Sequence, residues 1–479
     1  MGKSGGKGIS YFGLVAMGIG CMLGTSWLLL TGTWLETAGG PLNLVVAFAL
    51  CIIIELPFAF AYMEAIPMLP LPGGEVVYSY AAFGSRGGFA VGWAGILMNT
   101  IVFCWVDLAA VSLLDELFPA LGRTAVLYEL GDFPVTLPNV AIQLALAGAI
   151  LWVQLRGANV CASLAKLATV VLLIMCAVGL AVCFTHFDPA VYASDGGLDF
   201  DFAGSASLLS LLVFSVAGWE TVSKAAADAS GPAARKAGAA LITCLFLVTG
   251  ILCLVSTAVA GCMPWREAVG RTAPFADVLV SITGVPAVRV LFLATAFVGA
   301  VGVMNSTLYS SAQMLYGLSR FALVSRAFSA LHPKYGTPAR CIWFTAAFVV
   351  LTPFTGRLFF LPFINIASLA TIVMWIMSLA AVLRLRRARP DLRRPVRMPG
   401  GRVTAVLGVA ASVFLAGNIL LPFSPGALDG LEYALAAALA VSLLGIRSRA
   451  LSALSGALMA AFPAVGYTFL YLFTASAYC

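Results

Sequence analysis

The feature that most constrains this 479-residue chain is a series of apolar runs, each long enough to cross a lipid bilayer as a helix. About 20 consecutive apolar residues cover the hydrocarbon core of a membrane. Hydrophobic residues make up 61% of the chain and charged residues only 10%. A soluble domain carries about 25% charged residues. This balance excludes a soluble enzyme, a nucleic-acid-binding protein and a disordered scaffold, and it predicts an all-α polytopic membrane protein.

The runs predict twelve membrane spans, and no connector between them is long enough to fold as a soluble domain. The predicted spans are 11–36, 41–69, 89–118, 138–156, 160–184, 206–228, 237–262, 286–320, 340–356, 358–384, 403–422 and 430–446. The apolar segment 451–478 is either a thirteenth span or a re-entrant hydrophobic tail.

Lys and Arg are distributed unequally between the loops on the two sides of these spans. With residues 1–10 in the cytoplasm, all but five of the 27 Lys and Arg fall on the cytoplasmic side. The loop 185–201, on the other side, contains four Asp and no Lys or Arg. Cytoplasmic loops of membrane proteins are enriched in Lys and Arg. We therefore predict a multi-pass protein of the cell membrane with a cytoplasmic N-terminus.

Two spans contain glycine and polar residues at the depth where an uninterrupted helix is expected. One cluster runs from Gly18 to Ser26 and the other from Phe214 to Glu220. Glycine in a helix interior costs about 1 kcal/mol relative to alanine, so both clusters favour local unwinding. Interrupted spans at matching positions of two halves indicate inverted repeats with a binding site near the bilayer midplane. The alternative is close helix packing through small residues, which the glycines at 20 and 24 also fit.

This pattern predicts a two-repeat organisation of the chain. Its parts are a cytoplasmic N-terminus (1–10), a first five-helix repeat (11–184), a second five-helix repeat (206–384), a basic cytoplasmic loop (385–402) and C-terminal membrane helices (403–479).

An unwound segment within the membrane has a specific chemical consequence. Its second half-helix begins with unpaired N–H groups at the positive end of a helix dipole, which suits a carboxylate. The unpaired carbonyls that end the first half-helix suit an ammonium group. Together the two breaks predict a site for a zwitterion, and Phe214, Trp27 and Trp219 are candidates for an aromatic gate; ordinary interior packing explains each ring equally well.

Ionisable residues within spans are costly and are functional candidates by default. Glu55, Asp107, Glu220 and Lys224 qualify. We expect Asp107 to lie near the binding chamber, where a carboxylate would favour a cationic side chain; the alternative is a buried acid bonded to a neighbouring helix. Glu220 is a candidate for orienting the second break or for titration. Glu55 and Lys224 are expected to be structural or interfacial, Lys224 because its side chain can extend toward the cytoplasm.

Cysteine and histidine give no sign of a metal site or of a cofactor. The 11 cysteines occur singly, mostly in apolar runs, and the chain has only two histidines. We interpret the cysteines as small apolar residues and predict no metal and no cofactor.

Several motifs, in order along the chain, resemble the amino acid–polyamine–organocation superfamily of amino-acid permeases. The matching pieces are Gly18–Ser26, Ala38–Pro41, Pro72-Gly73-Gly74-Glu75, Phe214-Ser215, Gly218-Trp219-Glu220, Leu315–Arg320, His332-Pro333, Gly336–Pro338 and Arg389–Leu392. The resemblance implies a LeuT-type fold with a 5+5 inverted repeat and transport by alternating access. It is nearest to the branch of basic amino acid and polyamine antiporters.

The family's binding residues carry over onto matching positions of this chain. The resemblance implies carboxylate contacts at the backbone of Ile19, Gly20, Cys21, Met22, Leu23 and Gly24, and ammonium contacts around Phe214, Ser215, Ala217 and Gly218. It also implies a gating role for Phe214. The chain departs from the family at Leu172, where many members carry a lysine, and at Asn305–Thr307, where the antiporter branch has a tryptophan.

The expected function is secondary active transport of amino acids or related amines, as an exchanger with a lean to cationic substrates. Two alternatives remain: proton-coupled uptake of neutral amino acids, and a transport-inactive amino-acid sensor or partner subunit. The expected partners are the small-molecule substrate and the lipid bilayer, without nucleic acid, and a homodimer is compatible with this. An intramembrane enzyme is disfavoured because the sequence offers no His/Asp or Ser/Lys constellation.

Overall fold

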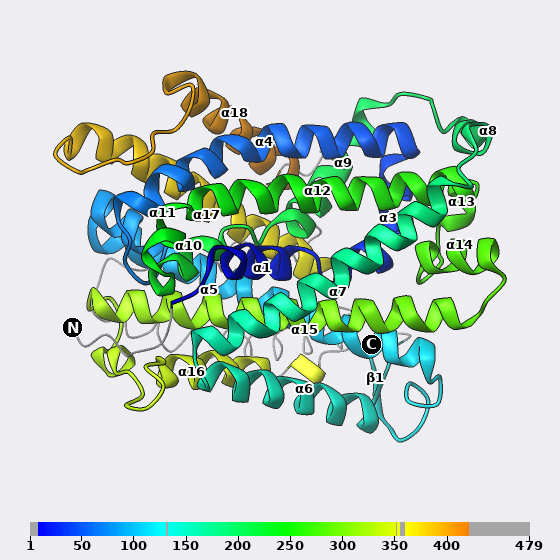
Figure 1. Ribbon diagram of the computed structural model, residues 1–479, viewed down its shortest axis with the longest axis horizontal. Helices are drawn as coiled ribbons and strands as arrows, with labels where there is room; N and C mark the ends of the chain where they lie inside the picture. The colour runs from blue at the N-terminus through cyan, green and yellow to red at the C-terminus, as the bar shows by residue number, and fades with distance from the viewer. Residues whose placement is uncertain (1–7, 131–132, 351, 355–359, 421–479) are drawn as a thin grey trace, which may run out of the picture.

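The structure is a computed structural model that describes residues 8–130, 133–350, 352–354 and 360–420. Long helices run side by side along the longest axis of the molecule, with short helices and loops at its two ends (Figure 1). Within the described residues, eight helices are long and apolar enough to cross a membrane, or nine when the bent pair 202–209 and 211–228 is taken as one span. The prediction of a helical, multi-pass membrane protein is confirmed. The predicted spans 430–446 and 451–478 lie outside the described residues.

The long helices begin and end close to the predicted spans. They are α4 (Pro41–Met68), α5 (Glu75–Leu117), α6 (Leu137–Leu155), α7 (Ala158–Phe184), α12 (Ala237–Cys262), α15 (Ala287–Arg320) and α17 (Phe360–Ala388). The eighth candidate span is Tyr11–Leu29, and α18 (Arg402–Leu420) is a shorter apolar helix. Helix α5 starts well before the predicted span 89–118, and Gly84 bends it (φ +71°, ψ −155°). The segment before Gly84 is thus a short helix of its own, attached to the membrane span.

The first and sixth spans consist of shorter helices. The first comprises α1 (Tyr11–Met22), α2 (Ser26–Leu29) and α3 (Thr31–Ala38); the sixth comprises α9 (Phe202–Val216), α10 (Thr221–Ala225) and the 3₁₀ turn Ala226–Asp228. Connecting helices are α8 (Pro189–Ala193), α11 (Gly231–Arg235), α13 (Trp265–Ala268) and α14 (Pro274–Thr283). Helix α16 (Ala339–Val349) lies in the predicted span 340–356 and is shorter than that span. Asp201 caps α9 by accepting hydrogen bonds from the amides of Ala203 and Gly204.

One element falls outside the all-α expectation. Strands β1 (Val126–Leu130) and β2 (Phe133–Thr136) form an antiparallel hairpin between α5 and α6. The hydroxyl of Tyr128 donates to the carbonyl of Phe354, 2.5 Å away, which ties the hairpin to the segment after α16.

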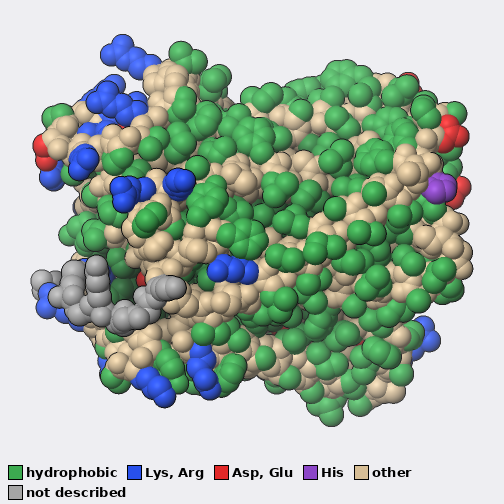
Figure 2. Space-filling model, in the orientation of Figure 1, with side chains coloured by type: hydrophobic (Ala, Val, Ile, Leu, Met, Phe, Trp, Pro, Cys, Tyr) green, Lys and Arg blue, Asp and Glu red, His purple; other side chains and the backbone are tan. Residues whose placement is uncertain are grey.

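The two ends of the molecule differ in charge, as the loop composition predicts. Most Lys and Arg side chains on the visible face lie at the end where the chain begins, whereas acidic and His side chains mark the opposite end (Figure 2). We call these the basic end and the acidic end. The basic end contains the loop 389–401, which Glu64 of α4 holds in place through Arg386, Arg394 and the amide of Met398.

Helix α1 lies inside the bundle, packed against α7, α10, α12 and α15. Ten of its twelve residues are buried, including all from Gly13 to Met22. The interior of the molecule therefore surrounds the first interrupted span, where the sequence predicts the site.

Candidate functional site

The first span is interrupted at Leu23, Gly24 and Thr25, between α1 and α2. Among the residues that the structure describes, none accepts a hydrogen bond from the backbone N–H of Gly24, Thr25 or Ser26. The Thr25 hydroxyl is buried and likewise has no partner there. The break thus leaves a group of buried donors inside the bundle. Such an arrangement is suited to an anionic group.

The sixth span is interrupted between Val216 and Thr221. Gly218 has φ +126°, in the region that residues with a Cβ rarely adopt. Its amide donates to Glu220 Oε2 at 2.9 Å, so the Glu220 side chain stabilises the turn in which both residues lie. In the described part of the chain, the amides of Gly218, Trp219 and Glu220 make no bond to the carbonyls of Phe214, Ser215 and Val216. These carbonyls form the end of α9 and are suited to a cation.

The two breaks touch each other. A Cβ placed on Gly218 would lie 3.0 Å from the carbonyl carbon of Cys21 and 3.1 Å from its oxygen, so only glycine allows this approach. Helix α15 passes beside both breaks: Thr221 Oγ1 and Ser310 Oγ are 3.1 Å apart. Ser306 Oγ lies 3.5 Å from where a Gly20 Cβ would be. The residues predicted from the two clusters, from Ile19 to Gly24 and from Phe214 to Gly218, are thus brought together and buried.

The three aromatic candidates occupy different surroundings. Phe214 packs edge-on against Trp105 of α5, with ring centroids 5.3 Å apart, at the end of α9. Trp219 is stacked on Trp375 of α17 at 5.3 Å, and its indole N–H donates to Glu55 Oε2 at 2.8 Å. Trp27 donates to the carbonyl of Gly24 at 2.9 Å, on the acidic-end side of the first break. Of the three, Phe214 is the ring at the broken end of a helix.

Asp107 lies in α5 but on another face. Two positions along an α-helix differ by about 200° in direction, so Asp107 faces away from the side on which Trp105 contacts Phe214. Its carboxylate is buried, and neither oxygen has a hydrogen-bond partner among the residues whose placement is given. The structure therefore does not bring Asp107 to the contact between the breaks.

A cluster of buried charges adjoins the second break, and sequence reasoning identified only part of it. Lys224 Nζ lies 2.9 Å from Glu75 Oε1 and 4.0 Å from Glu220 Oε1, and all three side chains are inaccessible to solvent. Glu55, which holds Trp219, is also fully buried. Glu75 appeared in the sequence only as the end of the Pro-Gly-Gly-Glu motif. Its partner was not apparent, because Lys224 belongs to a distant segment.

The Pro-Gly-Gly motif explains how Glu75 reaches that cluster. Gly73 (φ +108°) and Gly74 (φ +51°) form the turn before α5. A Cβ on Gly73 would lie 2.8 Å from the Cα of Gly317, and one on Gly74 would lie 2.6 Å from Ser223 Oγ. The turn therefore passes between α15 and α10 with no room for side chains.

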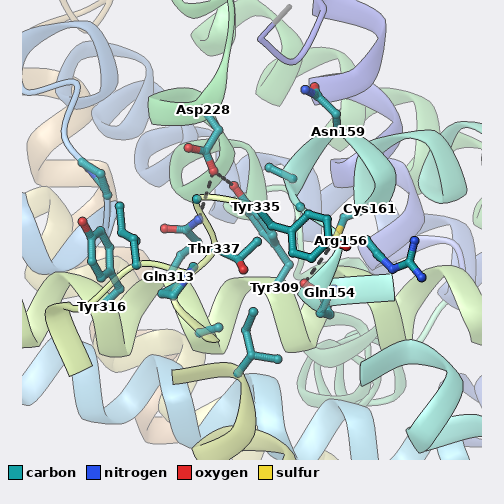
Figure 3. A pocket seen from close by; sticks show the side chains of 18 of the residues that line it. Gln154, Arg156, Asn159, Cys161, Asp228, Tyr309, Gln313, Tyr316, Tyr335 and Thr337 are labelled. Atoms are coloured by element: carbon teal, nitrogen blue, oxygen red, sulfur yellow. Dashed lines mark hydrogen bonds between the residues drawn. The ribbon is translucent and has the colours of Figure 1, made fainter. Parts of the chain in front are cut away.

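A cavity of about 510 Å³ opens on the basic-end side of the breaks. Its walls include Gln154, Asp228, Tyr309, Gln313 and Tyr335, and Figure 3 shows several of these side chains converging. None of the predicted site residues lines it. Sequence reasoning missed this cavity because its residues come from six separate segments of the chain.

These features define the class: a multi-pass helical membrane protein with two interrupted helices meeting in its interior. The chain belongs to the amino acid permease family, whose sequence model matches residues 9–445. The family predicted from the sequence motifs is confirmed.

Three relatives illustrate the range of the family. The chain is 26% identical to the branched-chain amino acid permease BcaP of Bacillus subtilis, over 87% of this chain and 89% of that one. It is 23% identical to the aspartate-proton symporter of the same organism, over 87% and 80% of the two chains. It is 24% identical to the human cationic amino acid transporter 4, over 80% of this chain and 60% of that one.

Proposed function

We propose that the protein is a secondary active transporter of amino acids or related amines, with its substrate site where the two breaks meet. The observation that carries this proposal is the contact between Gly218 and Cys21, which joins buried, unpaired donors to buried, unpaired carbonyls. The substrate carboxylate would accept from the amides of Gly24, Thr25 and Ser26. The ammonium group would bind the carbonyls that end α9. Family membership supports the same conclusion.

The proposed cycle is alternating access within a 5+5 inverted repeat, with residues 11–184 and 206–384 as the two repeats. Breaks of this kind let half-helices move while the site stays at the centre of the membrane. The charge difference between the two ends supports a cytoplasmic basic end. Phe214 lies at the end of α9 and would close over bound substrate, while Trp27 and Glu220 hold the backbone of the two breaks.

We infer that the transport mode is exchange, with a lean to cationic substrates. The resemblance to the basic amino acid antiporter branch supports this mode, and a relative is named as a cationic amino acid transporter. The decisive measurement uses purified protein in liposomes preloaded with unlabelled arginine or leucine. Uptake of the labelled amino acid should require internal substrate. Uptake that is independent of internal substrate would contradict exchange.

Asp107 provides a direct test of the cationic lean. Its carboxylate faces away from the contact between the two breaks in this structure, so Asp107→Asn should impair arginine exchange at least tenfold more than leucine exchange only if the carboxylate pairs with a cationic side chain during transport. Asp195→Asn, an exposed acid of the acidic end, is the matched control and should change neither. Equal loss of both substrates would remove Asp107 from substrate selection.

A second candidate, proton-coupled uptake, is favoured by the buried charges at Glu55, Glu75, Glu220 and Lys224. Glu75 and Glu220 share the ammonium group of Lys224, and the buried Glu55 accepts a hydrogen bond from Trp219. Burying several unpaired charges is costly, so protonation of one carboxyl lowers the free energy of the cluster. A relative is named as a proton symporter, which supports the same mode. Uptake driven by a pH gradient into empty liposomes would support this mode. Substrate binding without any flux would instead indicate the sensor alternative.

A further inference from the structure

The cavity at the basic end is built around one carboxylate. Asp228 Oδ2 accepts hydrogen bonds from the hydroxyl of Tyr309 at 2.5 Å and from Gln313 Nε2 at 3.0 Å. Both donors belong to α15 and are buried. Figure 3 shows the two side chains directed at Asp228 across the cavity. The carboxylate is thereby fixed in position, and its neutral donors leave its charge uncompensated.

The basic side chains of the cavity rim do not neutralise Asp228. Arg156 lies over the ring of Trp152, 4.2 Å from its centroid, and extends away from Asp228 in Figure 3. Lys334 Nζ lies 5.3 Å from the centroid of Tyr335. Among the described residues, neither Arg156 nor Lys334 forms an ion pair with an acidic side chain. The Asp228 carboxylate is thus without an ion pair among the described residues, while the ring of Tyr335 faces both Lys334, at 5.3 Å, and Arg156, at 6.0 Å.

Three tyrosine rings line the same space: Tyr309, Tyr316 and Tyr335. Aromatic faces attract cations, and carboxylates pair with ammonium groups. The volume of about 510 Å³ falls within the range of pockets for small molecules, about 300–1,000 Å³. Tyr309 and Gln313 already donate to Asp228, and among the described residues Arg156, Asn159 and Lys334, which also line the cavity, form no hydrogen bond to it.

We propose that this cavity is a second binding site, which takes the ammonium group of a small organic amine with Asp228 as its counter-ion. This proposal rests on the proposed function, because it places the cavity on the substrate pathway, as a binding site for the substrate amine between the central breaks and the cytoplasm. Helix α15 runs from the contact between the two breaks to the cavity at Asp228. Ser306, beside Gly20, is about 10 Å from Gln313 along a helix that rises about 1.5 Å per residue.

The backbone next to Asp228 closes this part of the bundle. The amide of Ile9 donates to the carbonyl of Asp228 at 3.0 Å, and the amide of Ser230 donates to the carbonyl of Ile9 at 3.0 Å. The start of the first span is therefore attached to the end of the sixth beside the cavity. Separation of these segments would widen the cavity beside Asp228 toward the basic-end surface.

The test is equilibrium binding of radiolabelled putrescine to the purified full-length protein in lipid nanodiscs. Putrescine has two ammonium groups and no carboxylate, so it fits Asp228 and lacks the group that the first break would hold. Wild type should bind it saturably, and Asp228→Asn should weaken binding at least tenfold. Asp228→Glu should retain most of the affinity, and Asp195→Asn, the matched control, should leave it unchanged.

Other outcomes separate this proposal from the proposed function. Absence of saturable binding to wild type, or equal binding by Asp228→Asn, overturns the second site even where leucine or arginine exchange is observed. Loss of putrescine binding in Asp228→Asn with no exchange by wild type supports the second site while the transport proposal fails. Should Asp228→Asn not fold, as judged by gel filtration, Tyr335→Ala replaces it. That variant should weaken binding several-fold, and unchanged binding overturns the proposal.

Discussion

Gly218 is the residue at which the geometry of the two breaks is least tolerant of change. Its φ of +126° and the backbone of Cys21 at about 3 Å both exclude a side chain. Gly218→Ala should therefore destabilise the protein by about 1–3 kcal/mol and reduce amino-acid uptake by liposomes at least tenfold. Gly250→Ala is the control, because Gly250 lies in α12 with no atom within 4 Å of an added Cβ. It should leave uptake unchanged and raise thermal stability slightly, because glycine in a helix interior costs about 1 kcal/mol relative to alanine.

Lys224 is the only cation among the buried charges at the second break within the described chain. Lys224→Met leaves Glu75 and Glu220 without a cationic partner, and removing one member of a buried ion pair costs about 3–5 kcal/mol. Thermal unfolding followed by tryptophan fluorescence in detergent should show this loss. The double variant Lys224→Met/Glu75→Gln should recover part of it. Lys236→Met, at an exposed position of the basic end, should have little effect; equal melting of the Lys224 and Lys236 variants would contradict the assignment.

For single residues, the sequence predicts the structure where its determinants are local. The glycine clusters weaken the helix at their own positions, so the breaks near Gly24 and Gly218 could be predicted. The partners of Glu75 and Asp228 could not, because they are set by packing of distant segments. The orientation of Asp107 depends on the rotation of α5, which an almost uniformly apolar span does not define.

Among the elements, the loop 389–401 depends on one buried acid. Glu64 of α4 binds Arg386, Arg394 and the amide of Met398. Glu64→Gln removes charged hydrogen bonds worth about 2 kcal/mol and should increase the rate of trypsin cleavage at Arg393 or Arg397 about 30-fold. Asp391→Asn is the control, since Asp391 pairs with Arg389 on the surface and such pairs contribute little. An unchanged cleavage rate in Glu64→Gln would show that other contacts hold the loop.

Element boundaries were predictable wherever an apolar run ends at charges, proline or glycine, as for α4, α7 and α12. The start of α5 was not, because the helical segment before Gly84 is short and follows directly on the Pro-Gly-Gly turn, and its ion pair with Lys224 of α10 is a contact with a distant segment. The hairpin at 126–136 escaped prediction as well. It pairs only nine residues in two strands, a length at which the sequence pattern is ambiguous.

For the whole molecule, the separation of charge between the ends predicts its orientation. With the basic end in the cytoplasm, a cysteine at Asp195→Cys should react with a membrane-impermeant maleimide on intact cells. One at Lys334→Cys should react only after permeabilisation. The cysteines of the described part of the chain are buried or partly buried, so wild type gives the background. The reverse labelling pattern would invert the topology.

The ion pair between Lys224 and Glu75 also has a mechanical consequence. It fastens the inner half of the sixth span to the short helix before Gly84, and parting two charges in a dry interior is costly. The glycine bend offers far less resistance. A rotation of that half-helix would therefore move the short helix with it, and the bend at Gly84 would absorb the motion. A conformational change at the second break would in this way be transmitted to the surface of the bilayer.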